Sequence, residues 1–354
     1  MARNYSGSVE TVLGSKPLSE LGRTLTHEHL ALDFCKFYVA PPRHIKHIPD
    51  GNNLSLRNVG YLRQYPYSSL YNLEFRDKDA AEAVKIDVEL YKEAGGGTIV
   101  ENSSHGLNRN IPLMKQISQS TGVNVIAGTG FYVACMQQAS TLNMTKEDMY
   151  NLMRQELEEG CVECPEVKAG CIGEVGSSWP IEDFEKRAIR ATGELQEQLR
   201  CPVSFHPGRD ASAPAEILRL YQEAGGNSEK AIMSHIDRTL NEEQLLEFAD
   251  ATKCYIQFDL FGVECSYYQL NPLVAMPSDA QRVDLVALLK KENQLHRVLM
   301  SHDIHTKHRL IQFGGHGYSH IINNVVPVMI IRGFTTEETE LLTIENPKRW
   351  LARQ

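Results

Sequence analysis

The stretch Thr24-Leu25-Thr26-His27-Glu28-His29 lies near the start of the chain and joins a short β-branched run to two histidines. Side chains alternate along an extended strand, so we expect His27 and His29 to point to one side and Glu28 to the other. Two imidazoles on one side of a strand end can bind one metal ion. The stretch therefore predicts a strand that ends at a metal site, provided that similar residues follow later strands.

The composition is that of a globular protein with a large core. The chain has 354 residues, of which 42% are hydrophobic and 23% are charged. Its net charge of −9 argues against nucleic acid or an anionic membrane surface as a general partner. No apolar run has the length of a transmembrane helix or the pattern of a signal peptide. Because several of the 8 cysteines lie in apolar runs, we expect a reducing, cytoplasmic environment.

From residue 77 onward, helical patterns alternate with short apolar or β-branched runs. Apolar residues at spacings of three and four indicate the helices. With the opening strand, the predicted strands are 24–29, 98–100, 123–127, 171–172, 203–205, 231–233, 254–258 and 298–300. This α/β alternation without a linker predicts a parallel sheet closed into a (β/α)8 TIM barrel, as a single domain over residues 1–354. The best dinucleotide-binding candidate, at 128–131, lacks a third glycine, which disfavours an open sheet.

Three segments lie outside the repeating pattern. Residues 8–23 predict a short N-terminal hairpin that turns at 14–17. Residues 34–76 are rich in tyrosine and predict an irregular insertion, which we interpret as a lid or wall over a site. Residues 335–354 predict one or two C-terminal helices packed on the outside.

Further metal-binding residue types follow four of the later strands: Glu174, His206, His235 and Asp303. In a barrel, the C-terminal strand ends open onto one face, where barrel enzymes carry out their chemistry. The whole set is too large for one ion and fits two, which a shared carboxylate holds roughly 3.5–4 Å apart. Glu174 is placed to be that bridge.

Other histidines and charges near the end of the chain receive a simpler interpretation. We expect His302 to point away from its neighbour Asp303 and to be structural. We interpret His305, His308, His316 and His320 as surface histidines, although their spacing would also suit a zinc site. The run 307–309 is expected to be a solvated face.

The motif set resembles the amidohydrolase superfamily and, more closely, the phosphotriesterase-related proteins of the phosphotriesterase family. The motifs are THEH at 26–29, GLNRNI at 106–111, GTGFY at 128–132, GEVG at 173–176, FHPGRD at 205–210, SHIDRT at 234–239 and SHDI at 301–304. The resemblance implies that His27, His29 and Asp303 bind a buried ion, and that His206 and His235 bind a more exposed one. A water or hydroxide would bridge the two ions, and Asp303 would accept its proton and deliver it to a leaving nitrogen. Zinc is the first expectation, while manganese, iron and cobalt suit the same ligands.

Two departures from the best-studied phosphotriesterases bear on the reaction. Glu174 stands where those enzymes carry a carboxylated lysine, and Arg238 and Leu260 stand where they use an acidic residue and a histidine. These changes argue against organophosphate or lactone hydrolysis. Arg238 and Arg209 are expected either to hold a substrate carboxylate or sulfonate or to pair with Asp237 and Asp210.

The substrate prediction rests on the resemblance alone. Animal phosphotriesterase-related proteins imply hydrolysis of N-acetyltaurine to taurine and acetate, hence a small anionic N-acyl substrate. Tyr132 is expected to hydrogen-bond the scissile group or to wall the pocket, and Asn102 to line its floor. A phosphotriesterase- or lactonase-like esterase on the same metals and a non-catalytic binding barrel are the alternatives. The resemblance leaves a homodimer open.

Overall fold

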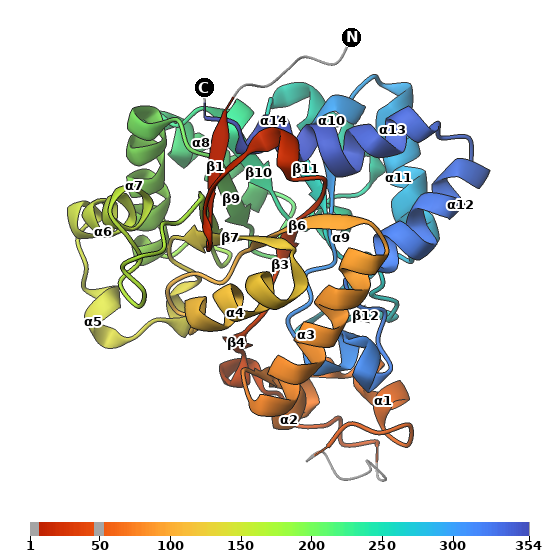
Figure 1. Ribbon diagram of the computed structural model, residues 1–354. Coiled ribbons are helices and arrows are strands. Elements are labelled where there is room, and N and C mark those ends of the chain that lie inside the picture. The colour runs from red at the N-terminus through yellow and green to blue at the C-terminus, as the bar shows by residue number, and fades with distance from the viewer. Residues whose placement is uncertain (1–6, 46–52, 354) are drawn as a thin grey trace.

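Eight parallel strands form one sheet in the order β14-β11-β10-β9-β8-β7-β6-β3, and helices surround it (Figure 1). The computed structural model describes residues 7–45 and 53–353. All eight predicted strands are confirmed: β3 (Arg23–Glu28), β6 (Gly96–Glu101), β7 (Asn124–Thr129), β8 (Cys171–Gly176), β9 (Val203–His206), β10 (Ala231–Met233), β11 (Tyr255–Phe258) and β14 (Val298–Met300).

The barrel closes where β14 meets β3. The N–H of His27 donates to Ser301 Oγ (3.0 Å), and the N–H of Asp303 donates to His27 O (3.2 Å). Glu28 faces the other way, as its place in the strand predicts. Its Oε1 accepts the N–H of His302 (2.8 Å). The first and last strands are thus joined by side chains as well as by the main chain, and the TIM barrel is confirmed.

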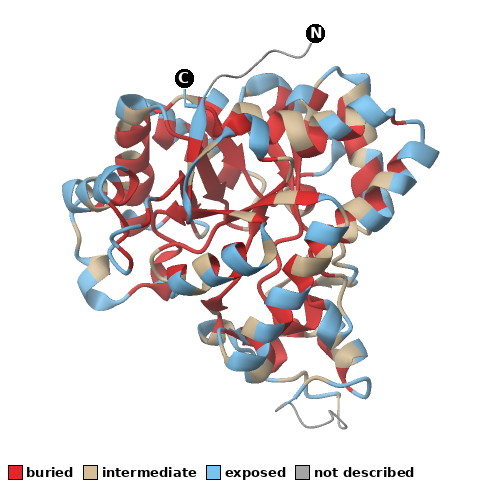
Figure 2. Cartoon of the chain, viewed as in Figure 1, coloured by how far each residue is buried: buried red, intermediate tan, exposed pale blue. Residues whose placement is uncertain are grey.

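The helices of the barrel cover the sheet with their apolar faces and leave their outer faces exposed (Figure 2). In α7, the buried residues include Phe184, Ala188, Ala191 and Leu195, which are spaced by three and four. The principal helices are α3 (Lys78–Glu93), α4 (Ile111–Thr121), α6 (Lys146–Glu158), α7 (Asp183–Leu199), α8 (Ala213–Glu223), α10 (Glu242–Ala251), α11 (Asp279–Lys291) and α12 (Val326–Ile331), with the short helices α5 (Ala139–Leu142) and α9 (Ile236–Thr239) between them.

The N-terminal hairpin and the C-terminal helices lie together at one end of the barrel (Figure 1). Strands β1 (Ser8–Thr11) and β2 (Gly14–Pro17) pair antiparallel, so the turn is at 12–13. The predicted turn at 14–17 is wrong, because those residues form the second strand. Helices α13 (Thr336–Glu340) and α14 (Asn346–Leu351) follow. Trp350 is fully buried and its indole N–H lies 3.2 Å from Val203 O, so the tail covers the barrel end rather than its side.

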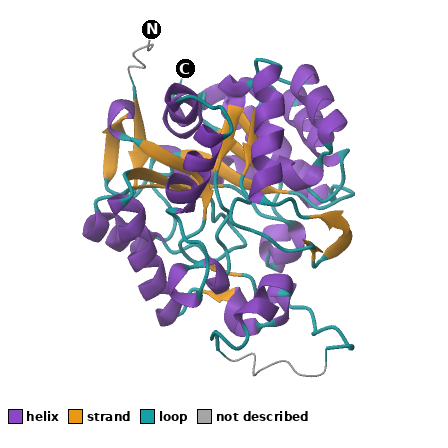
Figure 3. Cartoon of the chain, turned by 90° about the vertical axis from the view of Figure 1, so that its right-hand side faces the viewer, coloured by secondary structure: helices purple, strands orange, loops and turns teal. Residues whose placement is uncertain are grey.

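The insertion lies at the opposite end of the barrel from the termini (Figure 3). It contains α1 (Val59–Gln64), α2 (Leu70–Leu73) and β5 (Glu74–Phe75), which pairs with β4 (Leu32–Asp33). The prediction of an irregular segment is therefore wrong for this part, and residues 46–52 lie outside the described residues. A second hairpin, β12 (Tyr267–Tyr268) and β13 (Asn271–Ala275), lies between β11 and α11. Within the described ranges, no helix is long and apolar enough to cross a membrane.

Asp87, on the buried side of α3, should make folding stability depend on pH. Its Oδ2 accepts the N–H of Ile311 (3.0 Å), and burial raises the pKa of this carboxyl to about 7. A carboxyl whose pKa is higher in the folded state stabilises the fold fully below the unfolded pKa, about 4, and loses that contribution as pH rises to about 7.

We expect Asp87→Asn to remove this loss, because an amide has the shape of the carboxyl and does not ionise. Between pH 5 and pH 8 the unchanged protein should lose about 2–3 kcal/mol more of unfolding free energy than the variant, at about 1.36 kcal/mol per pKa unit. Urea unfolding at both pH values measures the difference. Equal pH dependence in the two proteins would contradict the assignment.

Candidate metal centre

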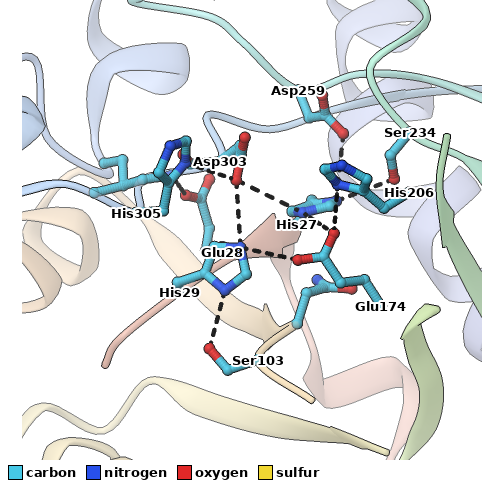
Figure 4. A network of polar contacts seen from close by, with 12 residues as sticks. His27, Glu28, His29, Ser103, Glu174, His206, Ser234, Asp259, Asp303 and His305 are labelled. Atoms are coloured by element: carbon cyan, nitrogen blue, oxygen red, sulfur yellow. Dashed lines mark hydrogen bonds and ion pairs between the residues drawn. The ribbon is translucent and has the colours of Figure 1, made fainter. Parts of the chain in front are cut away.

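Four histidines and two carboxylates converge at the C-terminal ends of the strands. Figure 4 labels all of them except His235. They come from β3, β8 and β9 and from the residues that follow β3, β10 and β14: His27, His29, Glu174, His206, His235 and Asp303. All six are buried. His29 Nε2 lies 3.3 Å from Asp303 Oδ1 and 3.5 Å from Glu174 Oε1. The structure therefore brings together every residue that the sequence analysis assigned to the metal site.

Glu174 belongs to one of two groups of ligand atoms and also lies 3.5 Å from His29 of the other group. In each group the ligand atoms lie within 4.8 Å of one another, and the groups are His27, His29, Asp303 and His27, Glu174, His235. The first matches the set expected for the buried ion. The second pairs Glu174 and His235 with His27, while His206 Nδ1 lies 2.9 Å from Glu174 Oε2 and 2.9 Å from His235 Nε2.

The protonation of the histidines suits a cation. Burial lowers the pKa of His27 to about 3 and holds the pKa of His206 and His235 well below the ordinary value. His27 Nε2 is buried, has no hydrogen-bond partner among the described residues, and lies 3.7 Å from both Glu174 Oε2 and Asp303 Oδ1. A neutral imidazole with a free lone pair between two carboxylates is a donor set that fits a divalent ion.

A bound cation would change the protonation states of Glu174, Asp303 and His29. Burial raises the pKa of Glu174 to about 8. Burial also opposes ionisation of Asp303, but the neighbouring His305 and His29 hold its pKa well below the usual range. Burial alone would lower the pKa of His29, whereas its hydrogen bond with Asp303 and the nearby Glu174 raise it to about 9. Without a metal ion, His29 carries the positive charge among these carboxylates, and an ion there would displace its proton.

Asp259 orients two of the imidazoles and was missed in the sequence analysis. Its Oδ1 lies 2.7 Å from His235 Nδ1, and its Oδ2 lies 3.3 Å from His27 Nδ1. Such carboxylates fix the tautomer and direction of a metal-binding histidine. The signal was available, because Asp259 directly follows β11 as the other residues follow their strands. Ser103, which follows β6, contacts His29 Nδ1 in the same way (3.0 Å).

The segment after Asp303 is buried, so the expectation of surface histidines and a solvated face is wrong for most of it. His305, His308, Lys307 and Arg309 are each 6% exposed or less. The reason is that this segment packs against the insertion, where the N–H of His308 donates to Asn72 Oδ1 (2.9 Å), and Lys307 pairs with Asp77 at the start of α3. Among the described residues, the groups compact enough for a metal ion include none of these histidines, nor His316 or His320.

His302 and Asn102 have structural contacts. His302 Nδ1 lies 2.8 Å from Glu28 Oε1, and its Nε2 accepts the N–H of Ile321 (3.1 Å). This geometry matches the structural role expected for His302. Asn102 is fully buried and donates to Thr26 O (3.0 Å), so it lies behind the cluster rather than on the floor of a pocket.

Two arginines lie at the mouth of the cluster without a carboxylate partner. Arg209 and Arg238 each lie 5.0 Å from the ring centre of Tyr268, and Arg209 Nη2 donates to its hydroxyl (2.8 Å). Neither has a carboxylate within 4.0 Å in the described chain, and Asp237, one of the two expected partners, pairs instead with Arg282 (2.7 Å). The expected salt bridges to Asp237 and Asp210 are therefore absent from the described residues. The Nε atoms of Arg209 and Arg238 have no hydrogen-bond partner among these residues.

The mouth is narrow and opens beside a groove. Directly over the cluster, the free volume is about 10 Å³, walled by Phe34, Tyr67 and Tyr132. The Tyr132 hydroxyl lies 3.5 Å from His206 Nε2. A groove of about 690 Å³ shares Arg209 and Arg238 with this mouth. The two guanidinium groups therefore stand between the cluster and the groove.

Comparisons with known proteins agree with this arrangement. The model of the phosphotriesterase family matches residues 7–351. The chain is 54% identical over 338 residues to a phosphotriesterase-related protein of Aedes aegypti, covering 94% of each. A resiniferatoxin-binding protein of Rhodobacter sphaeroides superposes with a TM-score of 0.91 and 26% identity, covering 98% of this chain and 95% of that one. A phosphotriesterase homology protein of Escherichia coli, with phosphate in its active site, gives 0.75 and 25% identity, covering 94% and 99%.

We expect Asp259→Asn to weaken metal binding by about 10- to 100-fold, because the change removes the carboxylate that orients His27 and His235. Competition with a chromophoric chelator measures the affinity, and elemental analysis gives the number of ions per chain. Asp183→Asn, an exposed change on α7, serves as the matched control. Equal metal affinity in the two variants would contradict the orienting role.

Proposed function

This chain belongs to the phosphotriesterase family, and we propose that it is a binuclear metal-dependent hydrolase that cleaves a small anionic N-acyl amide. N-acetyltaurine, cleaved to taurine and acetate, is the substrate that we propose first. Its single strongest support is the pair Arg209 and Arg238. These guanidinium groups lie beside the buried cluster and are unpaired with any carboxylate of the described chain. A planar guanidinium pair matches a sulfonate or carboxylate.

We assign the metal ions to the six buried residues. His27, His29 and Asp303 would hold one ion, His206 and His235 the other, and Glu174 would contact both. Two divalent ions, zinc in our proposal, would supply Lewis acidity toward the amide carbonyl and lower the pKa of a water molecule. The neutral state of His27, His206 and His235 supports this assignment, since a metal-binding imidazole must be unprotonated.

Asp303 is the group that we assign to proton transfer. Its carboxylate is ionised and faces the interior of the cluster, where it would accept a proton from the attacking water. The same carboxyl group would then protonate the departing amine nitrogen as the C–N bond breaks. His305 Nδ1 lies 2.8 Å from Asp303 O and 3.2 Å from Asp303 Oδ1, which fixes the direction of this carboxylate.

The aromatic wall supports a short acyl group. The free volume over the cluster is about 10 Å³, which is about the space that one water molecule needs. Its walls are Phe34, Tyr67 and Tyr132. An acetyl group requires only a small displacement of these side chains, whereas a long acyl chain requires the wall to open. The amine portion of the substrate would extend past the arginines toward the groove.

The test is an assay of the metal-loaded protein against N-acetyltaurine, N-acetyl amino acids, aryl phosphotriesters and lactones. We expect amide turnover to exceed turnover of the esters and phosphotriesters. Faster hydrolysis of phosphotriesters or lactones would favour the esterase alternative. Absence of turnover with full metal loading would favour a binding protein.

Arg238→Gln should lower kcat/KM for N-acetyltaurine by about 10- to 100-fold, because a hydrogen bond to a charged group contributes about 1.5–3 kcal/mol. The loss should appear mainly in KM, and N-ethylacetamide, which lacks the anion, should be unaffected. Arg219→Gln, on the exposed face of α8, is the control. An equal loss with the charged and neutral amides would refute anion recognition by Arg238.

A further inference from the structure

A second cavity, of about 290 Å³, lies between Arg63, the segment 262–264 and the segment 308–320. It has no lining residue in common with the mouth of the metal cluster or with the groove beside it. The proposed hydrolysis uses none of its residues. Its two sides differ in chemistry.

One side of this cavity carries an uncompensated positive charge. Arg309 is 6% exposed, and no carboxylate of the described residues lies within 4.0 Å of it. Its Nη1 donates to Asp303 O (2.6 Å), while its Nε has no hydrogen-bond partner among them. Arg63 also lines this cavity, where its Nη2 donates to Gly314 O (2.6 Å), and burial, with the charges of Arg309 and Arg63, lowers the pKa of His308 beside them. The buried charge of Arg309 without a counter-ion is costly, and an oxyanion would neutralise it while also contacting the exposed Arg63.

The other side offers acceptors. His316 Nδ1 lies 3.2 Å from Gly317 O, so Nδ1 carries the hydrogen and Nε2 presents a lone pair. That Nε2 is buried and has no partner in the described chain. A Cβ on Gly262 (φ +84°) would lie 2.3 Å from the His316 ring, so only glycine lets this loop approach the imidazole. Glu264 adds an exposed carboxylate on this side.

The fourth charged group of the cavity is already neutralised. Asp279 accepts from Arg282 Nη1 (3.0 Å), from the N–H of Gly262 (2.8 Å) and from His320 Nε2 (2.6 Å). It therefore needs no ligand. The polar atoms of the cavity that remain without a hydrogen-bond partner in the described chain are Arg309 Nε and His316 Nε2. Arg63 donates to Gly314 O and Glu264 accepts the N–H of Asp279 (3.1 Å), but neither has a charged partner among the described residues.

We propose that this cavity binds a small zwitterion, with its oxyanion at Arg309 and Arg63 and its protonated amine at His316 and Glu264. This is the chemistry of a free amino acid or amino sulfonate. A simple anion would leave the His316 lone pair unsatisfied, and a simple amine would leave the guanidinium groups unpaired.

The cavity is connected to the metal cluster through one hydrogen bond. Arg309 donates to the carbonyl oxygen of Asp303, whose carboxylate we assign to the metal site and to proton transfer. A ligand that draws Arg309 toward the cavity would shift the main chain of Asp303. Occupancy should therefore change kcat more than KM, a consequence that rests on the proposed function, whereas the binding itself does not.

The experiment is calorimetric titration of the metal-loaded, full-length protein with taurine and β-alanine, and with acetate and ethylamine as half-ligands. The titrations are repeated with the Arg238→Gln variant. Because this change weakens binding of an amine product at the mouth of the metal cluster, binding that remains is assigned to the second cavity. We expect both zwitterions to bind at least tenfold more tightly than either half-ligand. Arg63→Gln and His316→Phe should each weaken this binding at least tenfold, while Arg219→Gln should not change it.

Three results would overturn the proposal: acetate binding as tightly as β-alanine, binding lost in Arg238→Gln but unchanged in Arg63→Gln, or no binding at 10 mM ligand, roughly the weak end of metabolite affinities. Arg63 is exposed, so its variant should fold even if His316→Phe does not. An inactive protein that still binds zwitterions in this cavity would refute the proposed hydrolysis and leave the inference standing. A zwitterion that binds without changing kcat would overturn the link to Asp303.

Discussion

The hydrogen bonds between residues 27–28 and 301–304 are the constraint on which the rest of the structure depends. Ser301 Oγ lies 2.8 Å from His27 O, across 274 positions of sequence. These contacts close the barrel, and the same contacts place His27 and His29 opposite Asp303. Closure of the fold and assembly of the cluster are therefore one event. Glu28 supports both, since its carboxylate binds the main chain of His302 and Ile304 on the far side of the strand.

Burial then decides the chemistry of the cluster. In the dry interior, the imidazoles of His27, His206 and His235 lose their protons, and only His29 keeps one among the carboxylates. Such a set has free imidazole lone pairs, and its protons on Glu174 and His29 are ones that a cation can displace, which is the condition that binds metal ions. The charge at the mouth of the cluster is positive, because the guanidinium groups of Arg209 and Arg238 lie there without a carboxylate partner in the described chain. A substrate with a polar carbonyl and an anionic tail fits these two regions.

The sequence predicted the barrel and its convergent residues because both follow from local patterns. Strand–helix alternation defines the eight units, and a residue that directly follows a strand must lie at the same face as the others. Asp259 also directly follows a strand, so the same rule could have assigned it to the site. The burial of Lys307 and Arg309 was not predictable, since it depends on how the insertion packs over an aperiodic segment. Likewise, only the structure shows that Asp237 pairs with Arg282 and leaves Arg238 free.

The central claim, that the six residues hold two metal ions with Glu174 between them, is tested most directly by anomalous diffraction from crystals of the zinc-loaded protein. The account predicts two anomalous peaks about 3.5–4 Å apart, one bounded by His27, His29 and Asp303 and the other by His206 and His235, with an oxygen of Glu174 on each. A single peak, or a Glu174 carboxylate that contacts neither ion, would contradict it.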